Sequence, residues 1–217
     1  MPLPKSLRTL TPGRIRDEPR LRAIALGIGL IPPRPMHSSA EAAVLTRLAG
    51  GARRVVELGV YEGSSAVVLL QALSADAELH LVDPFVDASG WALRAGWRAN
   101  PTATRLAVRR ARRAGPAIRW HLARSQDVGR NWRGGPADLV FIDGDHSPEG
   151  CREDWDVWHG HVSPRGAVAF HDARAGRPDG DGSPGPTSVV DDLFRTGRSD
   201  WTIVEEIDTL VVVQRKD

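Results

Sequence analysis

Two short stretches of the sequence carry glycine and acidic residues in an order that can bind a nucleoside. An apolar run at 54–58 contains Glu57 and is followed by Gly59 and Gly63, and a second apolar run ends at Asp83. In a parallel α/β sheet, a glycine turn lets the backbone approach a ligand closely, and the acid after the next strand can accept the ribose hydroxyls. The order of these residues therefore predicts a nucleoside site.

The spacing of the glycines indicates which nucleoside it would be. A dinucleotide-binding turn has the pattern Gly-x-Gly-x-x-Gly and places a pyrophosphate at a helix N-terminus. Here Gly59 and Gly63 are four residues apart, and the Glu57 carboxylate would repel a pyrophosphate. The acid suits a cationic ligand, such as the sulfonium and amino groups of S-adenosylmethionine. The alternative is an ordinary strand-to-helix turn in which the glycines only permit tight geometry.

A second concentration of ionisable residues follows two later apolar runs. Asp143 and His146 come after the first run, and His171 and Asp172 end the second. Neighbouring parallel strands lie about 4.8 Å apart, so Asp143 and Asp172 could share a divalent cation, with His171 as a nitrogen ligand or an orienting residue. Carboxylates suit magnesium, and a histidine also admits manganese, iron or zinc. The alternative is structural: Asp143, Asp145 and His146 could only cap a helix that begins at Pro148, and His171 could bond only to backbone.

The elements that must position these residues alternate between strand and helix. Ser38 and Glu41 have the spacing of a capping box, which predicts a helix that ends at Gly50. The two last strands are so close in the chain that they can only pair as a hairpin. We therefore expect an α/β fold, with a doubly wound, mostly parallel seven-stranded sheet and an antiparallel C-terminal strand. The predicted strands are 54–58, 79–83, 117–122, 138–142, 166–171, 201–207 and 209–213, and the helices between them are 64–74, 103–114, 148–160 and 188–196.

The composition favours one cytoplasmic domain. A chain of 217 residues with 41% apolar and 26% charged residues can bury one substantial core. Its single cysteine, Cys151, excludes an intrachain disulfide and is compatible with a reducing compartment. The apolar run at 21–31 is interrupted by Arg22 and lacks a cleavage site, so we expect a helix against the core and no signal peptide. No segment is long enough to span a membrane, and a homo-oligomer is compatible with the sequence.

The basic residues allow two interpretations. All but Lys5 and Lys216 of the 29 basic residues are arginine, although the net charge is only +2. The densest cluster lies in the helix predicted at 103–114, and it is either a solvated helix face or a phosphate-binding stripe of an RNA-modifying enzyme. We favour the solvated face, because no RNA-binding module or zinc spacing accompanies it. The cluster consists of Arg105, Arg109, Arg110, Arg112 and Arg113.

Taken together, these motifs resemble those of a known family. The run from Phe141 to Gly150, FIDGDHSPEG, is followed by Asp154, by Ser163-Pro-Arg-Gly166 and by Phe170-His-Asp172. The chain from about His37 to the C-terminus resembles the class I S-adenosylmethionine-dependent methyltransferases, and within them the bacterial small-molecule O-methyltransferases with an FIDGDH motif. The resemblance implies a Rossmann-like methyltransferase fold, with an N-terminal segment at 1–36 and a catalytic domain at 37–217. It also implies that the acceptor is a small molecule, a secondary metabolite or a sugar, and not a nucleic acid.

The resemblance further implies roles for individual residues. Asp83 would bind the ribose, Ser125 and Gln126 would hold the adenine, and His146 would be the general base. In metal-dependent catechol and antibiotic-sugar O-methyltransferases, acids at the places of Asp143 and Asp172 bind the cation. The neighbour that supplies a third ligand there is His171 in this chain, so the implied metal set is Asp143, His171 and Asp172. The first cofactor motif comprises Glu57, Gly59, Tyr61, Gly63, Ser64 and Ser65, with Asp143 beside them.

The residues that would select an acceptor lie outside the predicted sheet. Trp91 and Trp97 could form an aromatic wall for a planar or sugar acceptor, and the glycine-rich segment 174–186 could be a lid. Trp155 and Trp158, three residues apart on a predicted helix, are expected to pack against the sheet. Three other functions stay open from the sequence: a methyltransferase acting on nucleic acid, a nucleoside-binding module without catalysis, and a nicotinamide oxidoreductase, which the missing third glycine disfavours.

Overall fold

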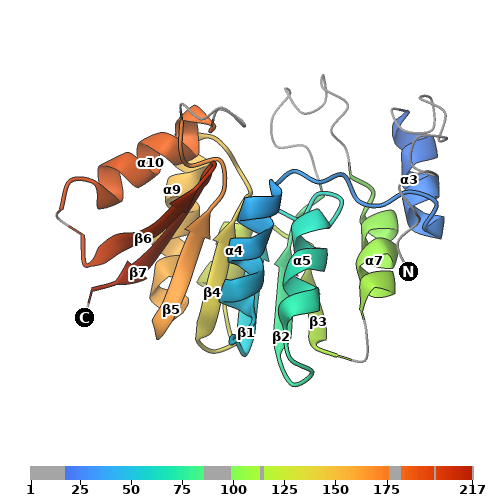
Figure 1. Ribbon diagram of the computed structural model, residues 1–217, viewed down its shortest axis with the longest axis horizontal. Coiled ribbons are helices and arrows are strands. Elements are labelled where there is room, and N and C mark those ends of the chain that lie inside the picture. The colour runs from blue at the N-terminus through green and yellow to red at the C-terminus, as the bar shows by residue number, and fades with distance from the viewer. Residues whose placement is uncertain (1–17, 86–98, 113–114, 176–181, 198, 217) are drawn as a thin grey trace.

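A single mixed sheet forms the centre of the molecule. The computed structural model describes residues 18–85, 99–112, 115–175, 182–197 and 199–216. Within these residues, seven strands are arranged in the order β3-β2-β1-β4-β5-β7-β6, and β7 runs antiparallel to both of its neighbours, whereas all other pairs are parallel (Figure 1). This arrangement confirms the predicted fold class. The strands are β1 Arg54–Leu58, β2 Glu78–Val82, β3 Ala117–His121, β4 Ala137–Ile142, β5 Val162–Phe170, β6 Trp201–Ile207 and β7 Leu210–Arg215.

Helices cover both faces of this sheet. Figure 1 shows α4, α5 and α7 side by side in front of the strands, with α9 behind β4 and β5. None of the described helices combines the length and the apolar character that a membrane span requires. The helices are α3 Pro19–Ile28, α4 Ser39–Ala49, α5 Ser64–Ala72, α7 Pro101–Ala111, α8 Ser125–Arg130, α9 Pro148–Trp158 and α10 Pro184–Phe194, with a 3₁₀ turn η1 at His159–His161.

The strands are apolar along their whole length because both of their faces are buried. Side chains alternate between the two faces of a strand. Val55 and Phe141 belong to a core with residues of α4 and α5, whereas Val56 packs with residues of α9 and α10. Trp155 and Trp158 are buried in this second core, as the sequence predicted. The two cores pack against opposite faces of the sheet and thereby fix the positions of the strand ends.

Several element boundaries differ from the sequence-based expectation. Strand β5 begins at Val162, four residues earlier than predicted, and its pairing with β4 shifts register between Ala137 and Leu139. Helix α10 begins at Pro184, because proline is well suited to the first turn of a helix. The short helix α8, Ser125–Arg130, was not predicted as a helix. It follows β3 directly, and six residues are too few for a periodic apolar pattern to be recognised.

The N-terminal helix α3 packs against α7, and this contact uses part of the arginine cluster. Ala25 and Leu26 are buried against α7 in a small core of their own. Arg110 donates hydrogen bonds to the carbonyl oxygens of Leu26 and Gly27, at the C-terminal end of α3, where a cation is favoured by the helix dipole. Arg105 lies over the ring of Trp120 at 5.4 Å. These two arginines therefore have partners within the chain.

Candidate active site

The predicted site residues converge at one edge of the sheet. Strands β2, β1, β4 and β5 are consecutive neighbours, and their carboxyl ends carry Asp83, Glu57, Asp143 and the His171-Asp172 pair. The amide of Asp143 donates to the Leu58 carbonyl at 2.8 Å, and the amide of His171 donates to the Ile142 carbonyl at 3.0 Å. The backbone ladder thus continues into the site and holds these side chains on rigid elements.

The glycine turn after β1 is required by the packing of the protein itself. Gly59 has a φ of +86°, and a Cβ atom there would lie 2.0 Å from the carbonyl oxygen of Asp143. Gly63 has the same φ, and its Cβ would lie 2.6 Å from a methyl carbon of Val108 on α7. Both positions need glycine because they combine a left-handed backbone with a close neighbour. The sequence suggested ligand approach as the reason, whereas the structure shows contacts within the chain.

Asp83, the predicted ribose acid, anchors the same turn. Its Oδ2 accepts hydrogen bonds from the amides of Val60 and Tyr61 at 2.8 and 2.9 Å, and its Oδ1 accepts one from the amide of Phe85 at 2.6 Å. A carboxylate oxygen can accept two hydrogen bonds. Oδ1 therefore keeps room for one hydroxyl donor, and the side chain is only partly buried.

Glu57 is a fully buried acid with one oxygen left without a partner. Ser65 Oγ donates to Glu57 Oε1, whereas Oε2 has no hydrogen-bond partner among the residues that the structure describes. Burial, reinforced by the Asp143 and Asp83 carboxylates and opposed by the Ser65 hydrogen bond, raises the pKa of Glu57 well above its ordinary value. A buried acceptor of this kind is costly unless a ligand satisfies it. A cationic donor such as an ammonium group fits the chemistry of this position.

The other predicted cofactor residues have polar partners within the chain. Ser64 lies at the start of α5, and its Oγ is 3.0 Å from His37 Nε2. Ser125 Oγ and Gln126 Nε2 both donate to the buried carboxylate of Asp154. Neither His37 nor Asp154 was a predicted site residue, although Asp154 belongs to the motif that carried the family resemblance.

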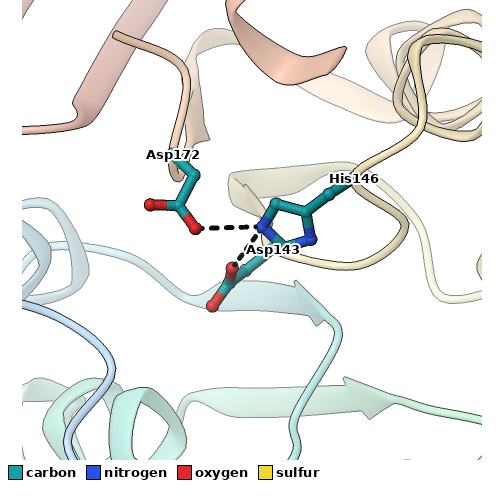
Figure 2. A group of neighbouring side chains, drawn as sticks. All are labelled: Asp143, His146 and Asp172. Atoms are coloured by element: carbon teal, nitrogen blue, oxygen red, sulfur yellow. Dashed lines mark hydrogen bonds and ion pairs between the residues drawn. The ribbon is translucent and has the colours of Figure 1, made fainter. Parts of the chain in front are cut away.

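His146 lies between the two predicted metal acids. Its Nε2 is 3.0 Å from Asp172 Oδ2 and 3.8 Å from Asp143 Oδ1, and its Nδ1 is 3.0 Å from the Gly144 carbonyl oxygen (Figure 2). Because carbonyl and carboxylate oxygens only accept, Nδ1 donates to Gly144 and Nε2 donates to Asp172 when the ring is protonated, and Nε2 is the atom that must lose its proton before the ring can act as a base. Burial opposes protonation, but the Asp172 hydrogen bond and the charges of both acids outweigh it and raise the pKa of His146.

His171 contacts the same two acids from the buried side. Its Nδ1 is 3.2 Å from Asp143 Oδ1 and 3.4 Å from Asp172 Oδ2, and its Nε2 is 3.4 Å from Glu41 Oε2. Burial opposes protonation of the ring, but Asp143, followed by Asp172 and Glu41, raises the pKa of His171 far above its ordinary value. These contacts favour the protonated form of the His171 ring, which lies against both carboxylates.

Glu41 links the site to the far end of the chain, which the sequence did not indicate. The predicted capping box at Ser38 and Glu41 is present, but Glu41 also accepts hydrogen bonds from the amide and hydroxyl of Thr209. Burial opposes ionisation, but the His171 contact and these hydrogen bonds lower the pKa of Glu41 to about 2. Glu41, a capping residue of α4, therefore also holds His171 in place.

The donor set at this edge fits a divalent cation. Ligand atoms of Asp143, His146 and Asp172 all lie within 4.8 Å of one another (Figure 2). Two carboxylate oxygens and an imidazole nitrogen suit manganese, iron or zinc, and the carboxylates also suit magnesium. The implied set of Asp143, His171 and Asp172 is also close together, but His171 directs its second nitrogen to Glu41.

The alternative role as helix caps applies to one nearby acid only. Asp145 Oδ1 accepts a hydrogen bond from the Ser147 amide at 2.8 Å, and Ser147 Oγ accepts one from the Gly150 amide at the start of α9. His146 instead contacts both Asp143 and Asp172. The start of α9 is thus capped by Ser147 and uses neither Asp143 nor His146.

The start of α10 packs against the loop that carries His146. Asp172 has a φ of +51°, an uncommon conformation for a residue other than glycine, and its carbonyl oxygen accepts a hydrogen bond from the Ser183 amide. A Cβ atom on Gly185, at the start of α10, would lie 2.1 Å from the His146 carbonyl oxygen. The predicted acceptor-binding residues Trp91 and Trp97, and residues 176–181 of the predicted lid, lie outside the described residues.

Comparison with known proteins identifies the family. A family model described as a methyltransferase domain matches residues 56–173, which is more than half of the chain and includes the whole edge described above. The chain belongs to this methyltransferase family. Its membership confirms the enzyme class predicted from the sequence, an S-adenosylmethionine-dependent methyltransferase.

Solved structures share the fold at low sequence identity. The O-methyltransferase TomG of Streptomyces achromogenes, which is involved in tomaymycin synthesis and was crystallised with SAM, is 21% identical with a TM-score of 0.57, covering 93% of this chain and 91% of its own. Cofactor-bound Rv0187 from MTB is 18% identical with a TM-score of 0.63, covering 100% and 99%. An O-methyltransferase of Bacillus cereus in complex with SAH is 16% identical with a TM-score of 0.55, covering 96% and 100%.

Proposed function

We propose that this methyltransferase transfers a methyl group to a hydroxyl of a small molecule and that His146 is its general base. The observation that carries the proposal is the position of His146 Nε2 between the Asp172 and Asp143 carboxylates. These residues lie at the strand ends, next to the glycine turn after β1. Two of the structurally similar proteins are O-methyltransferases crystallised with SAM or SAH, which supports the same chemistry here.

The cofactor-binding residues each satisfy one part of S-adenosylmethionine. When bound, this cofactor supplies an electrophilic methyl group on a sulfonium. The unpartnered Glu57 Oε2 accepts from the ammonium group, and Asp83 Oδ1 accepts from a ribose hydroxyl. The two carboxylates belong to the carboxyl ends of the adjacent strands β1 and β2, and together they would hold the cofactor there. Holding donor and acceptor in near-attack geometry contributes several kcal/mol to catalysis.

The residues around His146 increase its strength as a base. A hydroxyl is a weak nucleophile at neutral pH, so the enzyme must take up its proton as the oxygen attacks. Nε2 accepts that proton, and the resulting imidazolium is stabilised by Asp172 and Asp143. The Gly144 carbonyl keeps the ring in the required orientation. Asp143 and Asp172 are also the residues that would hold a divalent cation, which would lower the pKa of a bound hydroxyl.

Replacement of His146 tests this proposal. We expect His146→Ala to lose at least a hundredfold in turnover while its affinity for S-adenosylhomocysteine is unchanged, because the base does not bind the cofactor. The measurement is methyl transfer from radiolabelled S-adenosylmethionine to a panel of catechols, phenols and sugars, with calorimetry for the affinity. His159→Gln, on the turn after α9, is the matched control. Wild-type turnover by His146→Ala would remove His146 from the mechanism.

A further inference from the structure

A buried acid lies next to the two residues predicted to hold the adenine. Asp154 on α9 is fully buried, and its Oδ1 accepts hydrogen bonds from Ser125 Oγ and from Gln126 Nε2, the latter at 2.8 Å. The indole of Trp158 donates to the Ser125 carbonyl oxygen at 3.1 Å and thereby holds the start of α8. Two residues of α9 thus fix the positions of Ser125 and Gln126.

The second carboxylate oxygen of Asp154 lies next to the loop after β4 that carries Asp143 and His146. Asp154 Oδ2 is a buried atom without a hydrogen-bond partner in the described part of the chain. A Cβ atom on Gly144 would lie 3.4 Å from this oxygen, which places the carboxylate directly beside the residue that follows Asp143. Burial raises the pKa of Asp154 to about 7, with the Ser125 hydrogen bond acting in the opposite direction.

The orientation of the Gln126 amide follows from the chemistry of its partner. A carboxylate oxygen only accepts hydrogen bonds, so Gln126 must turn its nitrogen toward Asp154. The Gln126 amide oxygen then points away from Asp154 and is an acceptor for a ligand. Ser125 has one hydroxyl proton, which it donates to Asp154, so its oxygen also presents lone pairs only. Both side chains are partly exposed and therefore reachable.

We propose that Asp154 is a positioning residue that makes the nucleoside site selective for a 6-amino purine. The proposal rests on the proposed function and on the adenine-holding role that the family resemblance implies for Ser125 and Gln126. An outward row of acceptors matches the two N–H donors of an adenine amino group. A 6-oxo purine would place an oxygen against these acceptors, and a site built to hydrogen-bond a donor discriminates strongly against an analogue that lacks it.

The test compares two cofactor products that differ at this one position. Calorimetry with S-adenosylhomocysteine and with its 6-oxo analogue S-inosylhomocysteine gives a ratio of dissociation constants for each protein variant. We expect the wild type to prefer the 6-amino compound by at least tenfold. Asp154→Asn should reduce this preference at least fivefold, because an amide can also donate and no longer holds Gln126 in one orientation. Asp156→Asn, an exposed position on the same helix, is the matched control and should keep the wild-type ratio.

The outcomes separate this inference from the proposed function. If the wild type binds neither compound, the proposed function fails. If it binds both equally, or if folded Asp154→Asn keeps the wild-type ratio, the inference is overturned while the cofactor assignment stands. If Asp154→Asn does not fold, Gln126→Met decides, because it removes the outward acceptor and leaves Asp154 in place. The wild-type ratio in Gln126→Met overturns the inference, and a ratio at least fivefold lower supports it.

Discussion

The acids at the strand ends show how the surroundings of a residue decide its charge. Glu57 and Asp172 are the same kind of group, but the pKa of Glu57 is raised by burial and by nearby carboxylates. Burial acts in the same direction on Asp172, yet hydrogen bonds from His146 and His171 hold its pKa below its ordinary value. Glu57 has no cationic partner among the described residues, whereas Asp172 is paired with the imidazoles of His146 and His171.

Replacement of Glu57 tests its predicted role at the residue scale. We expect Glu57→Gln to bind S-adenosylhomocysteine about 10- to 100-fold more weakly, because a hydrogen bond to a charged group contributes roughly 1.5–3 kcal/mol. The amide oxygen of glutamine still accepts from Ser65, so the fold is retained. Isothermal calorimetry measures the affinity, and urea denaturation measures the stability.

The two measurements together decide the role of Glu57. A neutral amide costs less to bury than a carboxylate, so the free energy of unfolding of Glu57→Gln should equal or exceed that of the wild type. Weaker binding with unchanged stability supports a direct contact with the ammonium group. Unchanged affinity would show that the unpartnered Oε2 does not face the cofactor.

At the scale of elements, one buried ion pair ties the N-terminal helix to the cofactor turn. Arg22 of α3 forms a bidentate ion pair with Glu62, with Nε 2.5 Å from Oε1. The amide of Arg34, in the segment between α3 and α4, donates to the same Glu62 carboxylate at 2.7 Å. Glu62 lies between Tyr61 and Gly63, so α3 and the segment after it hold the turn that would bind the cofactor (Figure 1).

Loss of Arg22 should therefore destabilise the protein strongly. Removing one partner of a buried ion pair leaves an uncompensated charge and costs about 3–5 kcal/mol. We expect Arg22→Ala to lower the free energy of unfolding by this amount in urea denaturation. Arg20→Ala, an exposed position on the same helix, should change it by less than about 0.5 kcal/mol.

A second substitution shows whether the cost arises from the unpaired acid. Adding Glu62→Gln to Arg22→Ala removes the buried charge and should restore part of the lost stability, so the two changes are not additive. Equal stability of Arg22→Ala and the wild type would mean that α3 does not support the turn.

At the scale of the whole molecule, a buried pair of histidines in the sheet makes the stability of the fold depend on pH. His80 of β2 is 6% exposed, its Nδ1 is 3.0 Å from His121 Nε2, and its ring meets the edge of Trp132. Burial, followed by the charge of His121 and opposed by Glu78 at 3.6 Å from Nε2, lowers the pKa of His80 to about 4. The folded protein thus keeps His80 neutral where the unfolded chain would protonate it.

This difference gives a pH dependence with a definite sign. Below pH 6.5 the unfolded chain binds a proton at His80, whereas the folded protein binds it only near pH 4. The free energy of unfolding therefore decreases as the pH is lowered from 6.5 to about 4. His80→Gln removes this loss and should gain about 3 kcal/mol relative to the wild type on going from pH 7 to pH 4. Glu57 and Asp154, whose pKa values are raised, act in the opposite direction in both proteins.

The variant and the wild type are therefore compared at each pH. Urea denaturation of both proteins at intervals between pH 7.5 and pH 4 gives the difference in unfolding free energy. A difference that does not change with pH would show that His80 titrates alike in the folded and unfolded states. The histidine pair would then have only a packing role.

The sequence by itself determined the fold class and the edge of the sheet that carries the site. Apolar runs that end in Asp83, Asp143 and Asp172 predict parallel strands whose carboxyl ends meet, because both faces of such strands are buried and ligands bind beyond their ends. The same local patterns predicted the capping box at Ser38 and most element boundaries to within a few residues. These features depend on neighbours in the sequence.

Only the tertiary structure decided which polar groups are partners. The contacts of Glu41 with Thr209, of Arg22 with Glu62 and of Asp154 with Ser125 join residues 168, 40 and 29 positions apart. Gly59 is likewise required by the carbonyl of Asp143, which reaches it only when β1 and β4 pair. Such contacts have no periodic or spacing signal, because they arise where the sheet order brings distant segments together. The charges and orientations of the site residues follow from these contacts and therefore from the fold.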